Sequence, residues 1–249
     1  MGAASAVPFP TRLPAKVAST RFEEVETLDA APDPRADAAT VDLLGVLAYG
    51  ELTAFERLAS DARLAPTITD KTALATMAAA EFEHYRQLHE HLLGMGVDPE
   101  RAMAPFVGPL DEFHDSTDPN DWLEGVIKAY VGDGLATDFY REVSAFVTDG
   151  PTRELVLHVL ADAGQAEFAV SRVREAVAQD PTVAGRLALW ARRLVGEALI
   201  QAQKVAVERD ALTELVVVGS GGDLAGIARL LTRLTDNHTA RMQALGLQP

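Results

Sequence analysis

AAAEFEHYRQL, residues 78–88, places a carboxylate and an imidazole where the surrounding pattern predicts the apolar face of a helix. This helix is predicted over about residues 70–93, and its apolar stripe continues on both sides of the two polar residues. Three residues advance an α-helix by about 300° and about 4.5 Å, so Glu81 and His84 lie side by side on one face. A purely structural core would place leucine or methionine there, so the two polar side chains point to a function.

The preceding helix has a polar exception of the same kind. VDLLGVLAYGELTAFERLASDAR begins at Val41 and is apolar at helical spacing except for Glu51. The connection to the helix at 70–93 is short, so the two helices are predicted to form an antiparallel hairpin. The apolar residues of the stripe around Glu51 are Leu44, Leu47, Phe55 and Leu58.

A second hairpin is predicted after a break in the pattern. Its first helix covers about residues 119–148, and Asp133 interrupts the apolar stripe of this helix. The tight link TDGPT leads into a helix at about 152–178. There, Asp162 and Gln165 are one turn apart on the apolar stripe.

The links between these four helices are short, long and short. The long connection covers about residues 97–118, and the sequence of links is that of a ferritin-like four-helix bundle with one crossover. Glu51 and Glu81 are 30 positions apart, and Asp133 and Asp162 are 29 positions apart. In two antiparallel hairpins, these spacings place the four carboxylates at a similar height in the bundle.

Two more helices are predicted at about 180–210 and 223–245, separated by a break at TELVVVGSGGD, residues 213–223. The expected fold is therefore all-α, a ferritin-like four-helix bundle of two hairpins joined by a long crossover, with two additional C-terminal helices. Residues 39–246 form this domain, and residues 1–38 are predicted to be a flexible arm. An α-solenoid is discounted because no repeat of solenoid period is visible.

Burying four carboxylates together is costly unless cations neutralise them. Two divalent ions are the simplest solution, and oxygen and imidazole donors with open positions suit iron or manganese. The chain contains no cysteine, which excludes thiolate ligands and disulfides. The pattern thus predicts a buried polar cluster that binds metal.

Several of the stretches quoted above resemble a known family. LLGVLAYGELTAFERL, AAAEFEHYRQL and HVLADAGQAEFAV are similar to the actinobacterial ferritin-like proteins grouped with the MiaE-like tRNA hydroxylases. The resemblance covers about residues 40–246. Those hydroxylases are non-haem di-iron oxygenases that act on an isopentenylated adenosine in tRNA. The resemblance implies that the metal-ligand positions are Glu51, Glu81, His84, Asp133 and Asp162.

One position departs from the family pattern. Gln165 stands where the second histidine of the pattern belongs, three residues after the carboxylate of the fourth helix. An amide oxygen is a weaker ligand for iron than imidazole, so the second metal is expected to be weak, absent or of another identity. Alternatively, Gln165 hydrogen-bonds the carboxylates. Two iron ions are the expected cofactor, with manganese or a single metal as alternatives.

Two functions are consistent with these residues. The first is a di-iron hydroxylase that uses O2 and receives electrons from an external reductase, because no GxGxxG motif is present. The second is a non-catalytic ferritin-like scaffold or structural metal-binding protein, which the glutamine at position 165 favours. A tRNA substrate is suggested by the resemblance alone. Iron storage is disfavoured because the two extra helices would hinder assembly of a cage.

The charge balance bears on location and partners. The net charge of -15 and a sequence pI of about 4.7 disfavour binding to nucleic acid and anionic membranes. No signal peptide and no continuous apolar stretch of spanning length is visible, so we expect a cytoplasmic protein without membrane contact. Alanine and leucine on the last two helices predict either a face that covers the bundle or a homodimer contact.

Two further polar residues, Asp138 and His238, each have two expected roles. Asp138 is expected either to lie near the metal ligands or to pair with Arg141. His238, on the last helix, is expected to be a donor behind the ligands or an interface residue.

Overall fold

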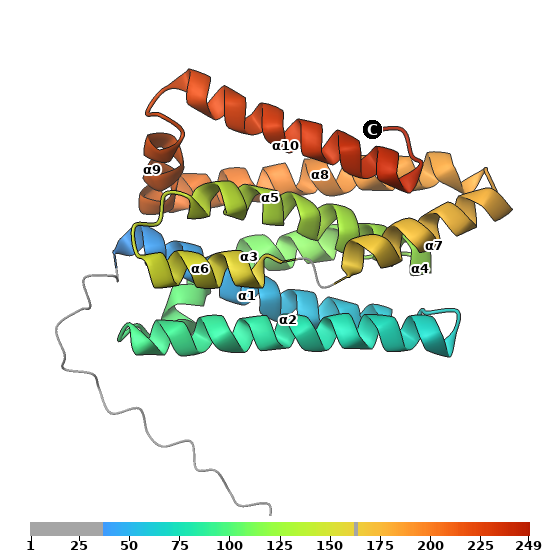
Figure 1. Cartoon of the computed structure of the whole chain (residues 1–249), viewed down its shortest axis with the longest axis horizontal. Coiled ribbons are helices and arrows are strands. Elements are labelled where there is room, and N and C mark those ends of the chain that lie inside the picture. Colours follow the sequence, from blue (N-terminus) through green and yellow to red (C-terminus); the bar gives the residue numbers. More distant parts are fainter. Residues whose placement is uncertain (1–36, 162–163) are drawn as a thin grey trace, which may run out of the picture. The chain divides into compact units, whose positions relative to one another are not determined.

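The computed structural model describes residues 37–161 and 164–249, which contain helices and no strand (Figure 1). Of the predicted arm, only its last two residues are described. Asp37 caps the first helix by accepting a hydrogen bond from the backbone nitrogen of Thr40 at 2.9 Å, and Ala38 begins that helix. The elements are α1 (Ala38–Asp61), α2 (Ile68–Gly94), α3 (Pro99–Ser116), α4 (Trp122–Ile127), the π-helical η1 (Lys128–Gly132), α5 (Asp133–Ser144), α6 (Gly150–Val159), α7 (Gln165–Gln179), α8 (Val183–Glu208), α9 (Asp210–Gly219) and α10 (Leu224–Leu245).

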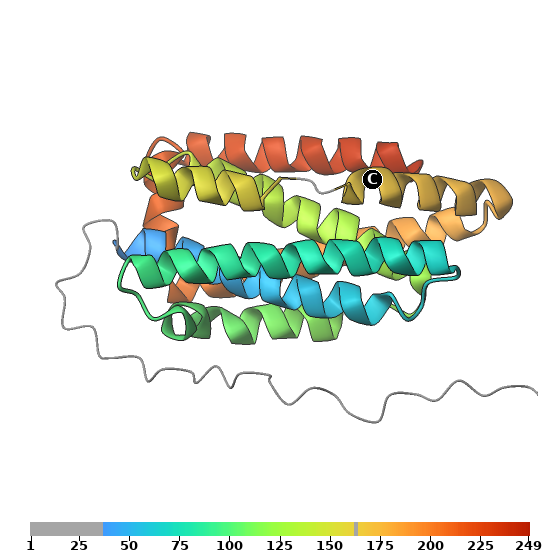
Figure 2. The same cartoon turned by 60° about the horizontal axis from the view of Figure 1, so that its bottom comes forward.

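The first hairpin follows the prediction closely. Thr67 caps α2 by accepting from the backbone nitrogen of Asp70 at 3.1 Å, and Gly96 ends the turn after α2 with φ +72°. Figures 1 and 2 show α1 and α2 side by side along their whole length. This packing fixes the relative height of the polar residues on the two helices.

The connection predicted at about 97–118 is largely helical, which corrects the sequence interpretation. Asp98 caps α3 and Pro99 opens it, while Pro105 and Pro109 lie inside the helix. A proline inside a helix removes a hydrogen bond and normally costs stability. Burial of the helix against α1 offsets this cost, and Phe106 of α3 is fully buried.

The third predicted helix is interrupted just before Asp133. It starts at Trp122, continues through α4, widens into the π-helical segment η1, and resumes as α5 with Asp133 as the first residue. A π-helical turn shifts the following residues around the helix axis, and such turns are frequent at functional sites. The backbone irregularity therefore coincides with a predicted metal ligand.

The fourth predicted helix is broken in two. α6 ends at Val159 and α7 begins at Gln165, with Gly164 in the left-handed region at φ +94°. Glycine adopts this conformation without steric cost, so it permits the chain to leave one helix and enter the next. Asp162 falls in the break, outside the described residues.

The C-terminal helices confirm one expectation and correct another. α8 and α10 lie where two additional helices were predicted. The break expected over 213–223 is confined to about 220–223, because TELVVVG belongs to α9. Gly221 and Gly222, with φ +107° and +71°, supply the turn into α10.

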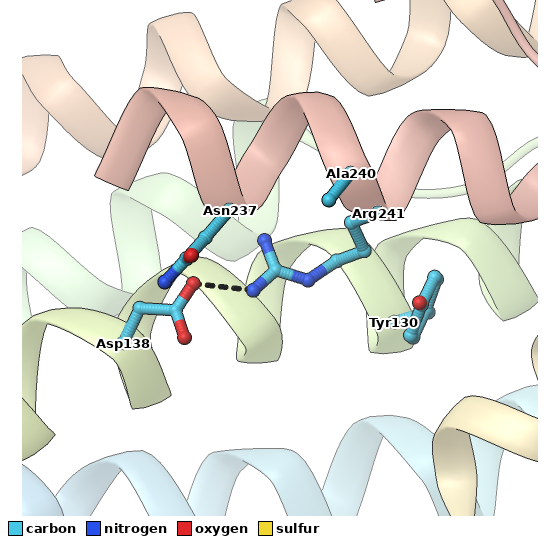
Figure 3. A pocket seen from close by; sticks show the side chains of 5 residues that line it. All are labelled: Tyr130, Asp138, Asn237, Ala240 and Arg241. Atoms are coloured by element: carbon cyan, nitrogen blue, oxygen red, sulfur yellow. Dashed lines mark hydrogen bonds and ion pairs between the residues drawn. The ribbon is translucent and has the colours of Figure 1, made fainter. Parts of the chain in front are cut away.

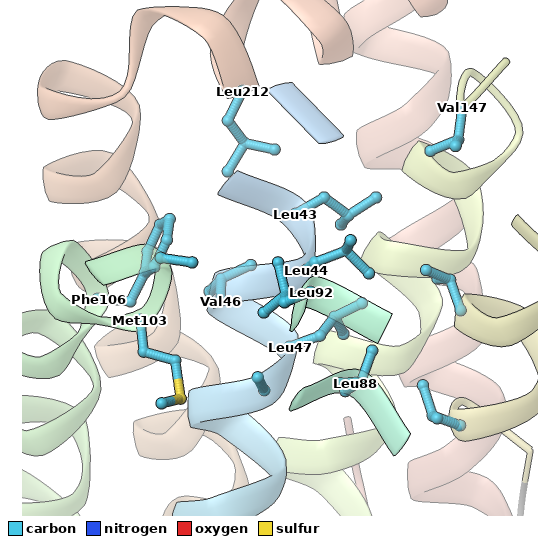
Figure 4. Packing of buried hydrophobic residues seen from close by; sticks show 14 of the residues in the cluster. Leu43, Leu44, Val46, Leu47, Leu88, Leu92, Met103, Phe106, Val147 and Leu212 are labelled. Carbon is cyan, nitrogen blue, oxygen red and sulfur yellow. The ribbon is translucent and has the colours of Figure 1, made fainter. Parts of the chain in front are cut away.

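The apolar core lies in clusters separated along the bundle. One cluster is built mainly on the N-terminal part of α1 and the C-terminal part of α2, as Figure 4 shows for Leu43, Leu47, Leu88 and Leu92. A smaller one joins the other ends of the same two helices, around Leu58 and Leu74. Glu51, Glu81 and His84 fall between these two clusters in the sequence of each helix.

One helix tests the expectation of no membrane contact. α1 is long and apolar enough to cross a membrane by length and composition, and α9 and α10 pass the same test only as a pair bent by 91°. Core helices of soluble proteins pass this test too, and 50% of the most apolar part of α1 is buried inside the protein. Packing against α2 and α3 accounts for the apolar character of α1.

Candidate metal centre

A polar cluster interrupts the apolar core of the first hairpin. Glu51 comes from the middle of α1, and Glu81 and His84 come from the middle of α2. Their side chains are 11%, 10% and 14% exposed, respectively. Since α1 and α2 pack along their length, the spacing of 30 residues between the two glutamates brings them to the same level.

The three side chains are close enough to share one cation. His84 Nδ1 lies 3.5 Å from Glu51 Oε2 and 3.3 Å from Glu81 Oε2, and one ligand atom from each residue lies within 4.8 Å of the others. Nitrogen and oxygen ligands typically bind divalent transition metals at about 2.0–2.2 Å. Ligand atoms at these separations can therefore surround a single ion, and two carboxylates with one imidazole suit iron or manganese.

Proton sharing holds the cluster together without a metal. Burial raises the pKa of the Glu51 carboxyl well above its ordinary value, and the adjacent Glu81 carboxylate adds to this effect. Hydrogen bonds to both glutamates raise the pKa of His84 to about 10. Burial acts to raise the pKa of Glu81, but hydrogen bonds from His84 and Glu51 outweigh it and lower that pKa. The opposite pKa shifts of the two glutamates thus favour the neutral form of Glu51 and the ionised form of Glu81, beside a cationic His84.

Asp133 lies within electrostatic reach of this cluster. Burial raises the pKa of its carboxyl well above the ordinary value, and the charge of Glu81 raises it further. Lys128, in η1, acts in the opposite direction. The Lys128 ammonium is buried and donates to the backbone oxygen of Thr117 at 2.8 Å.

Gln165 reaches the cluster from the first turn of α7. Its side-chain nitrogen donates a hydrogen bond to Glu81 Oε1. This contact agrees with the predicted alternative in which Gln165 binds a carboxylate. The structure therefore brings together Glu51, Glu81, His84 and Gln165 and leaves Asp133 nearby, while Asp162 lies outside the described residues.

Of the other two polar residues, Asp138 on α5 faces α10, and His238 belongs to α10. Asp138 pairs with Arg241, whereas Arg141 donates to the backbone oxygen of Leu160 at 2.9 Å, so the pairing expected with Arg141 is wrong. The buried Nδ1 of His238 has no hydrogen-bond partner among the residues that the structure describes. Burial, followed by the charge of Arg241, lowers its pKa.

One residue near the cluster was missed by sequence reasoning. The ring of His158, from the last turn of α6, packs edge-on against His84, with 6.2 Å between ring centroids. His158 is exposed and is not part of the three-residue cluster. Since it is four positions before Asp162, it does not fit the carboxylate-x-x-histidine spacing that directed the search.

Comparison with known proteins supports the fold. No curated protein matches the chain. The sequence model of one family, described as "Ferritin-like domain, actinomycetes", matches residues 34–219, which include every predicted ligand position. The match confirms the resemblance at the level of the ferritin-like family, whereas it does not extend to the narrower group of MiaE-like hydroxylases. Most of the sequence, including the helices that carry the polar cluster, is covered by this match, so the chain belongs to the ferritin-like domain family of actinomycetes.

Proposed function

We propose that this protein is a non-haem iron hydroxylase of the di-iron type. The observation that carries the proposal is the cluster of Glu51, Glu81 and His84, whose ligand atoms lie within 4.8 Å of one another inside an apolar bundle. These three residues would hold the first iron. Asp133, Asp162 and Gln165 are proposed to complete a second metal position. Glu81 would then lie close to both metal positions.

Iron bound at these residues would activate O2 and insert one oxygen atom into a C–H bond, with electrons from an external reductase. The residues of the chain supply the conditions for this chemistry. The apolar clusters on either side of the polar layer limit the access of water. The hydrogen bond from Gln165 orients the Glu81 carboxylate, and Glu51, whose raised pKa favours its neutral form, would lose its proton on binding a cation.

A non-catalytic scaffold that holds one structural metal is the second candidate. The hydrogen bond from Gln165 favours it, because the amide presents its nitrogen to Glu81. A cation at a second position would need the amide oxygen instead. In this alternative, the protein binds a single ion at Glu51, Glu81 and His84.

The substrate proposal is less specific than the metal proposal. A tRNA substrate follows from the family resemblance, but a net charge of -15 opposes broad contact with phosphates. We therefore propose a small apolar substrate as an equal candidate. A cytoplasmic location and a homodimer contact through the C-terminal helices also remain proposals.

Metal counting tests the two functions directly. The protein is loaded anaerobically with Fe(II), freed of excess metal, and assayed for iron per chain. The panel contains the wild type, Glu81→Gln, Gln165→His and Glu83→Gln. Glu83 is a matched control because it lies on the same helix but is exposed and pairs with Arg86.

The outcomes distinguish the two candidate functions, and one of them would refute the metal site itself. About two irons per wild-type chain, with a new near-ultraviolet absorption after O2 exposure, supports the hydroxylase. One iron that is lost in Glu81→Gln and kept in Glu83→Gln supports the scaffold with a single metal. Iron that appears only in Gln165→His shows that the wild-type site has lost its metal. Equal iron in Glu81→Gln and the wild type refutes the proposed site.

A further inference from the structure

The C-terminal helix contacts α5 next to a predicted ligand, although it lies beyond the family match. The match ends at residue 219, and α10 begins at Leu224. Arg241 of α10 is 11% exposed and donates from Nη2 to the backbone oxygen of Gly134 at 3.0 Å. The same nitrogen donates to the carboxylate of Asp138, and Figure 3 shows this pair between α10 and α5.

The absence of a side chain at Gly134 matters for this contact. A Cβ added at Gly134 would lie 2.5 Å from Arg241 Nε and 2.8 Å from its Cζ. A side chain at position 134 would therefore displace the guanidinium. Glycine at position 134 thus leaves room for the close approach of the guanidinium.

The contact is made directly behind a predicted ligand. Gly134 follows Asp133, and the π-helical η1 ends at Gly132, immediately before it. The direction in which Asp133 points thus depends on how the first turn of α5 is held after the π-helical turn. Arg241 holds this turn at two points, the carbonyl of Gly134 and the side chain of Asp138 one turn later.

We propose that Arg241 is a positioning residue that fixes the Asp133 carboxylate in the metal centre. The proposal rests on the proposed function, since it assumes that Asp133 binds metal. It also gives α10 a role, because a helix outside the family match then orients a ligand inside it. Partners behind metal ligands commonly change metal affinity by about 10–100-fold when they are removed.

A second arginine–carboxylate pair between α10 and α5 provides the matched control. Arg233 of α10 binds Glu142 of α5 with two hydrogen bonds of 2.8 Å and 2.7 Å. The Arg233 side chain is 50% exposed, and the pair lies more than two turns of α5 away from Asp133. If arginines merely attach α10 to α5, Arg233→Met and Arg241→Met should have similar effects.

The experiment measures Co(II) binding to the full-length protein by calorimetric titration, together with the visible spectrum of the Co(II) complex. Arg241→Met is expected to lower the affinity about tenfold or more and to change the spectrum. Arg233→Met should leave both unchanged. Arg241→Lys keeps the charge and a donor nitrogen, so it should retain more of the affinity than Arg241→Met. Circular dichroism verifies that each variant keeps its helix content.

Two further variants locate the effect at Asp133. In an Asp133→Asn background, Arg241→Met should change the affinity less than twofold, because the carboxylate it positions is gone. Gly134→Ala should reproduce the loss with Arg241 still present, whereas Gly132→Ala should not, since its Cβ would meet only Phe113 at an ordinary 3.7 Å.

The results that overturn the proposal differ from those that overturn the metal site. Equal affinity of the wild type and Arg241→Met refutes the positioning role and leaves the metal centre intact. Equal losses in Arg241→Met and Arg233→Met, or a loss that persists in Asp133→Asn, show a purely structural link. Absence of Co(II) binding in the wild type refutes the proposed function and the positioning role with it.

Discussion

Two isosteric substitutions in the polar cluster should affect the metal-free protein very differently. Burial and Glu81 raise the pKa of Glu51, which favours its neutral form, so Glu51→Gln is expected to be the milder substitution. Glu81 is ionised and lies 3.3 Å from the cationic His84, and it also accepts from Gln165. Glu81→Gln therefore leaves a buried cation without its counter-charge.

The magnitude follows from the distance. Two unit charges 3.3 Å apart interact with about 5 kcal/mol at an effective dielectric constant of about 20. Hydrogen bonds to charged groups are worth about 1.5–3 kcal/mol net, so we take about 3 kcal/mol for Glu81→Gln. In a protein of this size, this corresponds to a fall of about 6–12 °C in Tm. Glu51→Gln should stay within about 4 °C of the wild type.

The response to metal should separate both variants from the wild type. A ligand at 100 times its Kd stabilises the native state by about 2.7 kcal/mol, which raises the wild-type Tm by about 5–11 °C. Both Glu51→Gln and Glu81→Gln should lose this gain because each removes an anionic ligand. Differential scanning calorimetry with EDTA and with Mn(II) measures both effects, and Glu83→Gln, at an exposed position, should behave as the wild type.

Two results would contradict these assignments. If Glu51→Gln lowers the Tm of the metal-free protein as much as Glu81→Gln does, the proton is not on Glu51 and the assigned charge distribution is wrong. If Glu51→Gln keeps the full gain from Mn(II), Glu51 is not a ligand.

Three further predictions concern stability. Burial lowers the pKa of His114 from 6.5 to about 3, so the unfolded chain takes up a proton below pH 6.5 that the folded chain refuses until about pH 3. Stability should fall over this window, and urea unfolding of His114→Gln at pH 4.5 and pH 7 should show a smaller difference than the wild type; an equal difference contradicts the assignment. Asp70 is buried, and its carboxylate forms an ion pair with Arg172 Nε of α7 at 2.7 Å. Asp70→Asn should therefore lower the free energy of unfolding in urea by about 3 kcal/mol. A loss below about 1 kcal/mol would show that the pair is dispensable. A Cβ on Gly45 would collide with the α3 backbone, so Gly45→Ala should lower stability by about 1–3 kcal/mol. A Cβ on Gly50 would lie 3.9 Å from its nearest neighbour, so Gly50→Ala should leave stability unchanged. Equal Tm values for the two variants would argue against close packing of α1 on α3.

The predicted parts of the fold are those whose signal is local. α1, α2 and α10 begin and end within a few residues of the predicted bounds, because uninterrupted apolar periodicity and capping residues define them. Glu51, Glu81 and His84 were visible for the same reason, since each interrupts an apolar stripe on its own helix. Their meeting in space followed from the hairpin connectivity.

The parts that were not predicted depend on tertiary contacts or on small backbone changes. α3 forms despite Pro105 and Pro109 because it buries Phe106 against α1, which outweighs the local preference. The π-helical η1 differs from a regular helix only in its hydrogen bonding, which periodicity does not reveal. Arg241 and Asp138 are 103 positions apart, and a single contact at that separation leaves no pattern in the sequence.

The layered order of the first hairpin has a consequence for evolution within the family. Apolar clusters on both sides of the polar layer hold α1 against α2, so a substitution within the layer should lower stability without separating the two helices. A substitution of a polar residue in this layer can then persist while the helices stay packed. The polar site can therefore diverge through changes in a single layer, with the backbone around it unchanged.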